Sequence, residues 1–138
     1  MRQIPLGTIG TFTLLVLPEH LANQFKDAIL PQVLATPVMI LCMENAALNA
    51  IRPFLEEGES AVGTAIDVRH LAATPVGHTV RAEAEVTRVD GKRIAFKVSA
   101  RDEIEEIGAG THRRTLIKLG SFNERLAAKR AAGSKSRQ

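Results

Sequence analysis

Three residues of the sequence have the side-chain types that acid–base chemistry on an acyl group requires. Glu44 is a carboxylate in the otherwise apolar stretch ATPVMILCMENAAL (residues 35–48), Thr36 is a hydroxyl eight positions before it, and His70 ends a predicted strand. A carboxylate, an imidazole and a hydroxyl are the usual groups for proton transfer and for nucleophilic attack on an acyl carbon. A charged side chain in an apolar helix is costly unless it is paired or neutralised, so the placement of Glu44 favours a functional role.

Each of the three residues also has a purely structural interpretation. Thr36 followed by Pro37 fits a hydroxyl N-cap with proline at the first helical position. His70 fits an ordinary strand-end histidine, and Glu44 fits a structural salt bridge. Eight residues are about two helical turns, with roughly 80° between the two side chains, so Thr36 and Glu44 are expected to line neighbouring walls of one cleft. Taken alone the trio is a weak signal, and both interpretations stay open.

The helix that carries two of these residues is predicted from Thr36 to about Ile51 or Phe54. Pro53 and the EEGES turn (residues 56–60) end it. Its apolar residues cover nearly all of its faces, which is typical of a helix enclosed by other structure.

The rest of the chain is predicted to form mainly strands. Residues 78–90 alternate apolar and polar side chains, the Asp90-Gly91 pair is a hairpin turn, and residues 92–102 return. Three further strands are predicted, at residues 11–18, 61–73 and 106–119; Gly108 and Gly110 in the last one indicate a bulge or a close backbone approach. Residues 19–35 form a loop or lid, and a short helix from Ser121 to about Ala132 closes the domain.

This order of elements predicts a single α+β domain, residues 1–138, in which one curved antiparallel sheet wraps around one long helix. Residues from about 125 to 138 are expected to be a basic, fraying tail. An anionic partner for that tail is the alternative.

Composition excludes several classes of function. The chain has a net charge of +3, but Arg125, Lys129, Arg130, Lys135 and Arg137 all lie in the tail, and removing these five leaves about −2. Aromatic residues make up only 4%, without Trp or Tyr, so neither a basic nucleic-acid module nor a base-stacking platform is expected.

The sequence gives no sign of a metal, a cofactor or a membrane. The four histidines (His20, His70, His78, His112) and the lone Cys42 show no metal-ligand spacing, and a single cysteine forms no intrachain disulfide. We found neither a signal-peptide pattern nor an apolar run long enough for a membrane span. A cytoplasmic protein is therefore expected.

The sequence resembles the hot-dog-fold thioesterases, and within them the fluoroacetyl-CoA thioesterase family. The resemblance covers residues from about 8 to 128 and is most specific in the blocks GTAIDVRHLAATPVG (63–77) and EIGAGTHRR (106–114). These blocks lie within longer matching stretches: ATPVMILCMENA (35–46), GESAVGTAIDVRHLAATPVGHTV (58–80), VDGKRIAFKVSARDEIEEIGAGTHRRTLI (89–117) and FNERL (122–126).

The resemblance implies a hot-dog fold, a homodimer with active sites at the protomer interface, and an acyl-CoA substrate. The family's catalytic Thr, Glu and His fall on Thr36, Glu44 and His70. The glycine associated with the thioester falls on Gly63, and a substrate-contacting arginine falls on Arg114.

Two positions depart from the fluoroacetyl-specific pattern. Leu30 stands in the lid where an aromatic residue is expected, and Pro37 follows Thr36 where that pattern has glycine. Leu30 is therefore a candidate substrate-binding residue, and the acyl group that the chain prefers stays open.

The predicted activity is hydrolysis of a short-chain acyl-CoA to acid and CoA. Glu44 attacks the thioester or activates a water, His70 transfers protons, Thr36 orients Glu44 or the reacting group, and an N–H near Gly63 binds the oxyanion. No cofactor other than the CoA of the substrate is expected. The main alternative is a non-catalytic acyl-CoA or small-ligand binder on the same fold; a hot-dog dehydratase and a structural dimerisation domain are weaker ones.

Overall fold

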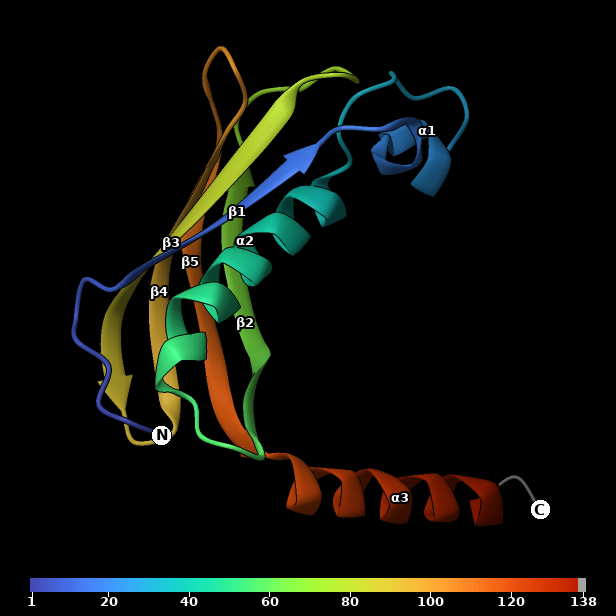
Figure 1. Cartoon of the computed structure of the whole chain (residues 1–138). Coiled ribbons are helices and arrows are strands. Elements are labelled where there is room, and N and C mark those ends of the chain that lie inside the picture. The colour runs from blue at the N-terminus through green and yellow to red at the C-terminus, as the bar shows by residue number, and fades with distance from the viewer. Residues whose placement is uncertain (137–138) are drawn as a thin grey trace.

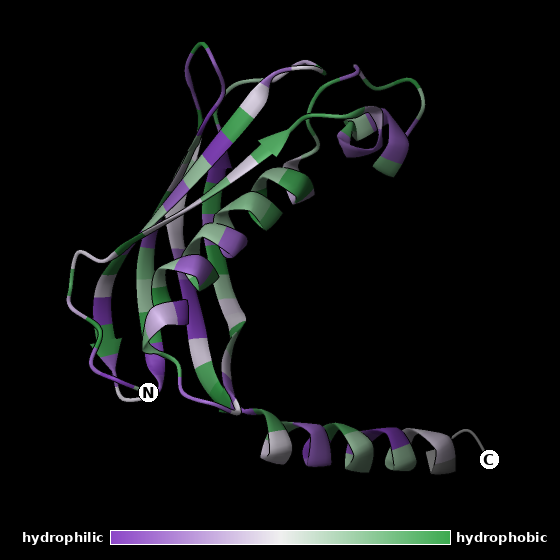
Figure 2. Ribbon diagram, viewed as in Figure 1, coloured by the Kyte–Doolittle hydropathy of each residue, from purple (hydrophilic) through white to green (hydrophobic). Residues whose placement is uncertain are grey.

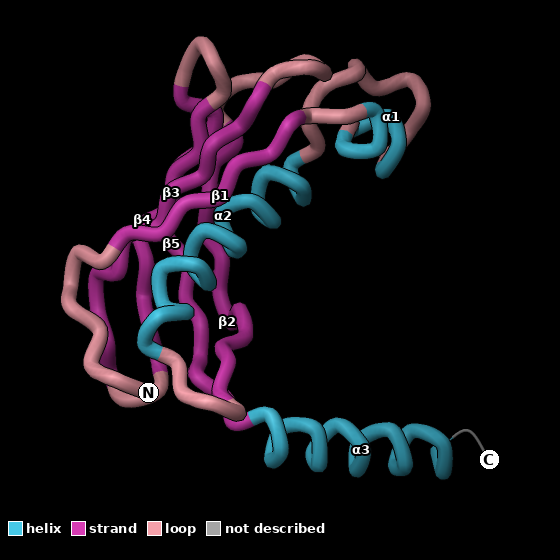
Figure 3. Tube along the Cα trace, viewed as in Figure 1, coloured by secondary structure: helices cyan, strands magenta, loops and turns pink. Residues whose placement is uncertain are grey.

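The computed structural model describes the backbone of residues 1–136 and the side chains of residues 1–134. Five strands form one antiparallel sheet, and one long helix lies against it (Figures 1 and 3). The strands are β1 (Ile9–Leu15), β2 (Glu59–His70), β3 (Thr79–Asp90), β4 (Arg93–Arg101) and β5 (Glu106–Lys118). The α-helices are α1 (Ala22–Phe25), α2 (Thr36–Ile51) and α3 (Leu119–Ser136), and short 3-10 turns cover Pro18–His20 and Arg52–Phe54.

The order of strands in the sheet is β1-β3-β4-β5-β2, so β2 is an edge strand that, among the described residues, pairs only with β5. The sheet curls around α2, which confirms the predicted α+β architecture. Gly10 on β1 allows this close packing, because a Cβ there would collide with the α2 backbone at Ala46 and Ala50. Gly108 on β5 similarly leaves room for the Met39 side chain, which confirms the predicted close approach.

The core lies between α2 and the concave face of the sheet. Figure 2 shows the apolar residues that α2 contributes to this layer. Met39, Met43 and Phe96 are among its largest fully buried side chains. One face of α2 stays uncovered in the single chain: Leu41 is 53% exposed, and Glu44 is also partly exposed. The predicted enclosure of the helix is therefore incomplete within the single chain.

The start of α2 differs from the sequence-based prediction. Its N-cap is Ala35, Thr36 is the first helical residue, and no side chain caps the helix. Because Thr36 is already inside the helix, its hydroxyl is available for another partner.

The C-terminal helix is longer than predicted and leaves the domain. α3 begins at Leu119 rather than Ser121 and continues to Ser136, projecting away from the sheet instead of closing it (Figure 1). Residues 125–136 are thus helical, and residues 137–138 of the predicted tail lie outside the described part. None of the described helices combines the length and hydropathy needed to cross a membrane.

Candidate active site

Thr36 and His70 form a hydrogen-bonded pair between the start of α2 and the end of β2. The distance from Thr36 Oγ1 to His70 Nδ1 is 2.8 Å. The pair lines an open hollow together with apolar residues that include Leu34, Leu71 and Ala73. The Thr36 hydroxyl is thus hydrogen-bonded to the imidazole of His70. The interpretation of Thr36 as a helix cap was therefore wrong.

The other ring nitrogen of His70 is available for proton transfer. His70 Nε2 is buried and has no hydrogen-bond partner among the described residues. Burial lowers the pKa of His70, with a smaller opposing effect from the Ala72 backbone. A lowered pKa keeps the imidazole neutral at pH 7, the form that accepts a proton.

Glu44 belongs to a second group of residues, at the other end of β2. Its Oε2 lies 3.6 Å from Arg114 Nη1. Gly63 borders the same carboxylate, since a Cβ at this position would lie 2.9 Å from Glu44 Oε2. Glu44, Gly63 and His112 line one hollow along β2. The structure therefore brings together three predicted site residues: Glu44, Gly63 and Arg114.

Arg114 is buried and held from two further sides. Its Nη2 donates to the Ala61 carbonyl at 2.6 Å, and its Nη1 lies 3.3 Å from His112 Nε2. Burial lowers the pKa of Arg114, whereas the Glu44 carboxylate raises it. Arginine remains charged in proteins, so Glu44 faces a fixed cation.

His112 is a member of this group that sequence reasoning missed. Its Nδ1 lies 2.8 Å from the Ala65 carbonyl, which can only accept, so Nδ1 carries the proton and Nε2 accepts from Arg114. Burial lowers the pKa of His112, and the Arg114 charge adds to this effect. The signal available in the sequence was the strand period of two, which puts residues 112 and 114 on one face.

The two groups are separate within one chain. No hydrogen bond among the described residues joins Glu44 to Thr36 or His70, and Thr36 and Glu44 line two different hollows. Gly63 and His70 are seven residues apart on β2, which is roughly 20 Å in a strand. The expectation of one cleft lined by Thr36 and Glu44 was therefore wrong for the single chain.

A β-bulge sets the direction of the side chains on β2. The register with β5 shifts between Gly63 and Ala65, so Gly63 pairs with Arg114 and His70 pairs with Gly108. Residues seven apart point to opposite faces of a regular strand, but one bulged residue restores the same face. Gly63 and His70 therefore both face α2.

The remaining candidate residues lie outside these two groups. Leu30 is in the loop after α1 and is 38% exposed, beside the more exposed Ile29. Cys42 is buried in the core, and burial raises the pKa of its thiol to about 11. In the part of the chain that the structure describes, no three His, Cys, Asp or Glu side chains come close enough to hold a metal ion.

A curved antiparallel sheet around one long helix is the fold of the hot-dog thioesterases. In this chain the fold carries a hydroxyl–imidazole pair and a carboxylate beside β2. A structure from Thermus thermophilus, described as a thioesterase superfamily member, superimposes with a TM-score of 0.92 at 30% identity, covering 98% of this chain and 99% of that chain.

More specific similarity identifies the family. The family model of fluoroacetyl-CoA-specific thioesterases matches residues 16–119. The fluoroacetyl-CoA thioesterase of Streptantibioticus cattleyicolor is 48% identical over 103 residues, which are 75% of this chain and 74% of that protein. A solved fluoroacetyl-CoA thioesterase structure matches with a TM-score of 0.88 at 40% identity, covering 92% of this chain and 98% of that one. The chain therefore belongs to the fluoroacetyl-CoA-specific thioesterase family.

Proposed function

We propose that this protein is a thioester hydrolase that converts a short-chain acyl-CoA to the free acid and CoA, using Glu44, His70 and Thr36. The observation that carries the proposal is the Thr36–His70 pair, which leaves the buried Nε2 of a neutral imidazole without a partner. A thioester carbonyl and its leaving thiolate supply the proton-transfer partner that this nitrogen lacks.

A homodimer would unite the two groups of residues. The free edge of β2 is a template for pairing with another strand, and Ile66 in its middle is 40% exposed. If two β2 strands pair antiparallel about an axis between Ile66 and Asp67, Gly63 of one protomer lies opposite His70 of its partner. The partly exposed Leu41 and Glu44 on α2 then face this seam.

In such a site each residue has a defined role. Glu44 attacks the thioester carbonyl or activates a water, and Arg114 pairs with the carboxylate. His70 transfers the proton that the departing thiolate takes up, and Thr36 orients the imidazole. An N–H near Gly63 stabilises the oxyanion, a contact typically worth about 3 kcal/mol.

The relatives suggest the substrate class. The Streptantibioticus protein is named for fluoroacetyl-CoA, and a variant of a 41% identical relative is solved with fluoroacetate and CoA, with a TM-score of 0.81 over 86% of this chain and 98% of that chain. Fluoroacetyl-CoA is thus one candidate substrate. Leu30 in the lid is the proposed contact that sets the preferred acyl group. The proposed location is the cytoplasm, where CoA thioesters are used.

The test is hydrolysis of a panel of short acyl-CoAs, followed by detection of the free thiol. Glu44→Gln should lower kcat/KM by at least about 100-fold, because it removes the nucleophile or base. Glu83→Gln, at an exposed position on the outer face of β3, is the matched control and should leave the rate unchanged. Saturable CoA binding without thiol release by the wild-type protein would favour the non-catalytic alternative.

A further inference from the structure

Four polar side chains are buried among the residues that the structure describes. His112 and Arg114 belong to the group around Glu44, whereas Thr74 and Asp102 have no part in the proposed chemistry. The Thr74 hydroxyl donates to Asp102 Oδ2 at 2.9 Å, and this bond is itself buried. A buried carboxylate is costly unless its oxygens are hydrogen-bonded. The contact fixes two segments relative to each other, the loop after β2 and the turn between β4 and β5.

Asp102 is held in place by the turn between β4 and β5. Its Oδ1 accepts hydrogen bonds from the backbone N–H groups of Ile104 at 2.8 Å and Glu105 at 3.0 Å. Burial raises the pKa of Asp102, but these two hydrogen bonds, the Thr74 hydroxyl and the nearby His78 together lower it by more. The carboxylate is therefore charged at neutral pH, and a charged acceptor makes a stronger hydrogen bond with Thr74.

Thr74 also joins the loop after β2 to the segment that leads into α2. Its backbone carbonyl accepts a hydrogen bond from the Leu34 N–H at 2.8 Å. Thr36 is two residues after Leu34, and His70 is four residues before Thr74. The β4–β5 turn, this loop and the start of α2 lie at the same end of the sheet (Figure 1). Thr36 and His70 are thus attached to two short segments that meet at Thr74.

The loop between β2 and Thr74 forms part of the surroundings of His70. The loop residues that line the same hollow as Thr36 and His70 are Leu71, Ala72 and Ala73. Burial lowers the pKa of His70, and the Ala72 backbone has the smaller, opposing effect. A displacement of this loop would therefore change the environment of the imidazole.

We propose that the Thr74–Asp102 contact positions the Thr36–His70 pair, so that Thr74 and Asp102 are positioning residues for the proton transfer. This inference rests on the proposed function for the role of His70. Both residues act through the loop and through the start of α2, away from the reacting atoms. Because proton transfer depends on the exact placement of the imidazole, a displaced loop should slow the reaction more than it weakens substrate binding.

The kinetic test compares two substitutions of Thr74. Thr74→Val removes the hydroxyl with little change of shape and leaves Asp102 Oδ2 without this donor, so kcat for an acyl-CoA should fall about 10-fold with KM nearly unchanged. Thr74→Ser keeps the hydroxyl and should retain most of the wild-type kcat. If circular dichroism shows that Thr74→Val does not fold, Thr74→Ala gives the same test, because it leaves space for a water at the carboxylate.

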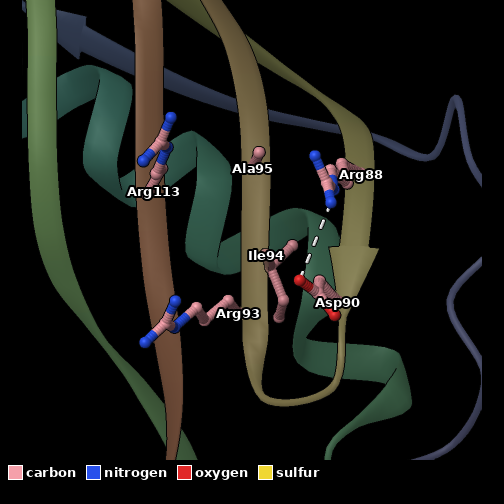
Figure 4. Close-up of a pocket in the computed structure, with 6 residues that line it drawn as sticks. All are labelled: Arg88, Asp90, Arg93, Ile94, Ala95 and Arg113. Carbon is pink, nitrogen blue, oxygen red and sulfur yellow. Dashed lines mark ion pairs between the residues drawn. The ribbon is translucent and has the colours of Figure 1, made fainter.

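Two controls separate positioning from a general loss of stability. Val86→Ala truncates a fully buried side chain on β3, so it should lower the midpoint of thermal unfolding while kcat of the folded protein stays unchanged. Arg88→Ala breaks a different polar contact, the exposed ion pair with Asp90 at 3.7 Å. Arg88 lines a hollow with Ala95 and Arg113 on the face of the sheet turned away from α2, so this variant should keep the wild-type rate (Figure 4).

Titration of His70 by nuclear magnetic resonance gives a measurement that needs no turnover. In protein labelled with ¹³C-histidine, the His70 signal is assigned by its loss in His70→Ala. In Thr74→Val the midpoint of its titration should rise toward 6.5, because burial is the larger of the two effects on this pKa and is relieved when the loop moves. Thr74→Ser and Val86→Ala should titrate like the wild-type protein.

The titration also separates this inference from the proposed function. If the wild-type protein hydrolyses no thioester but Thr74→Val shifts the His70 midpoint, the activity is wrong and the positioning role stands. Equal midpoints in the wild-type protein and Thr74→Val overturn the positioning role, whatever the hydrolysis assay shows. An equal shift in Val86→Ala overturns it as well, and so does a wild-type kcat in Thr74→Val.

Discussion

At the scale of single residues, Thr36 shows how a short polar side chain orients the histidine that is proposed to be catalytic. Because Ala35 is the N-cap, the Thr36 hydroxyl is not needed by the helix and binds His70 Nδ1 instead. A hydrogen bond at one ring nitrogen fixes the orientation of the imidazole and leaves the other nitrogen for the substrate.

This role predicts different results for two substitutions of Thr36. Thr36→Val keeps the shape but removes the hydroxyl, so kcat should fall about 10- to 100-fold with a smaller change in KM. Thr36→Ser keeps the hydroxyl and should retain most of the activity. Steady-state kinetics with one acyl-CoA measures both, and equal loss of kcat in the two variants would contradict the hydrogen-bonding role.

The lowered pKa of His70 predicts the pH dependence of hydrolysis. Burial disfavours the imidazolium, so the neutral form persists below the ordinary histidine value of 6.5. As the pH falls from neutral, the midpoint of the decline in kcat/KM should therefore lie below pH 6.5. A pH–rate profile in which the acid limb has its midpoint above 6.5 would rule this out.

At the scale of elements, strand β2 determines which side chains face the proposed site. The bulge between Gly63 and Ala65 turns both Gly63 and His70 toward α2, and the edge position of β2 keeps them accessible. Alternation along residues 61–73 is only partial in the sequence, because the strand changes phase at the bulge. Bulges depend on pairing with a distant strand, here β5, so the local sequence does not reveal them.

Gly63 is predicted to be required because of its small size. In Gly63→Ala the added Cβ would lie 2.9 Å from Glu44 Oε2 and 3.3 Å from His112 Cε1. The flexible Glu44 side chain is expected to move away from the added methyl group. This should lower kcat/KM at least about 10-fold, while the midpoint of thermal unfolding changes little. Gly120→Ala is the matched control, because nothing lies near that position. Wild-type activity of Gly63→Ala would remove Gly63 from the site.

Most of the elements were predictable, whereas the contacts within the site were only partly so. Hydrophobic period and turn residues predicted α2 and the five strands to within a few residues. The resemblance assigned Glu44 and Arg114 to the site, but neither it nor the residue pattern showed that they form an ion pair. The inclusion of His112 depends on strand register and burial, which are tertiary properties. The uncovered face of α2 was missed because an apolar helix gives the same pattern against a sheet or against a second protomer.

At the scale of the whole molecule, a single chain keeps the two groups of proposed site residues apart. Thr36 and His70 lie at one end of β2, and Glu44 with Arg114 lies near the other. The central claim is therefore that each working site combines Glu44 of one protomer with His70 of its partner. Apolar residues left exposed along the same seam, Leu41 and Ile66, agree with this arrangement.

Mixed dimers test this claim most directly. Glu44→Gln and His70→Ala homodimers are each expected to be nearly inactive. After the two variants are mixed, dissociated and reassociated, every heterodimer contains one site with both substitutions and one intact site. Random pairing should then restore about a quarter of the wild-type activity per protomer. A mixture as inactive as its parents, with heterodimers verified by mass spectrometry, would show that Glu44 and His70 do not act across the protomer interface.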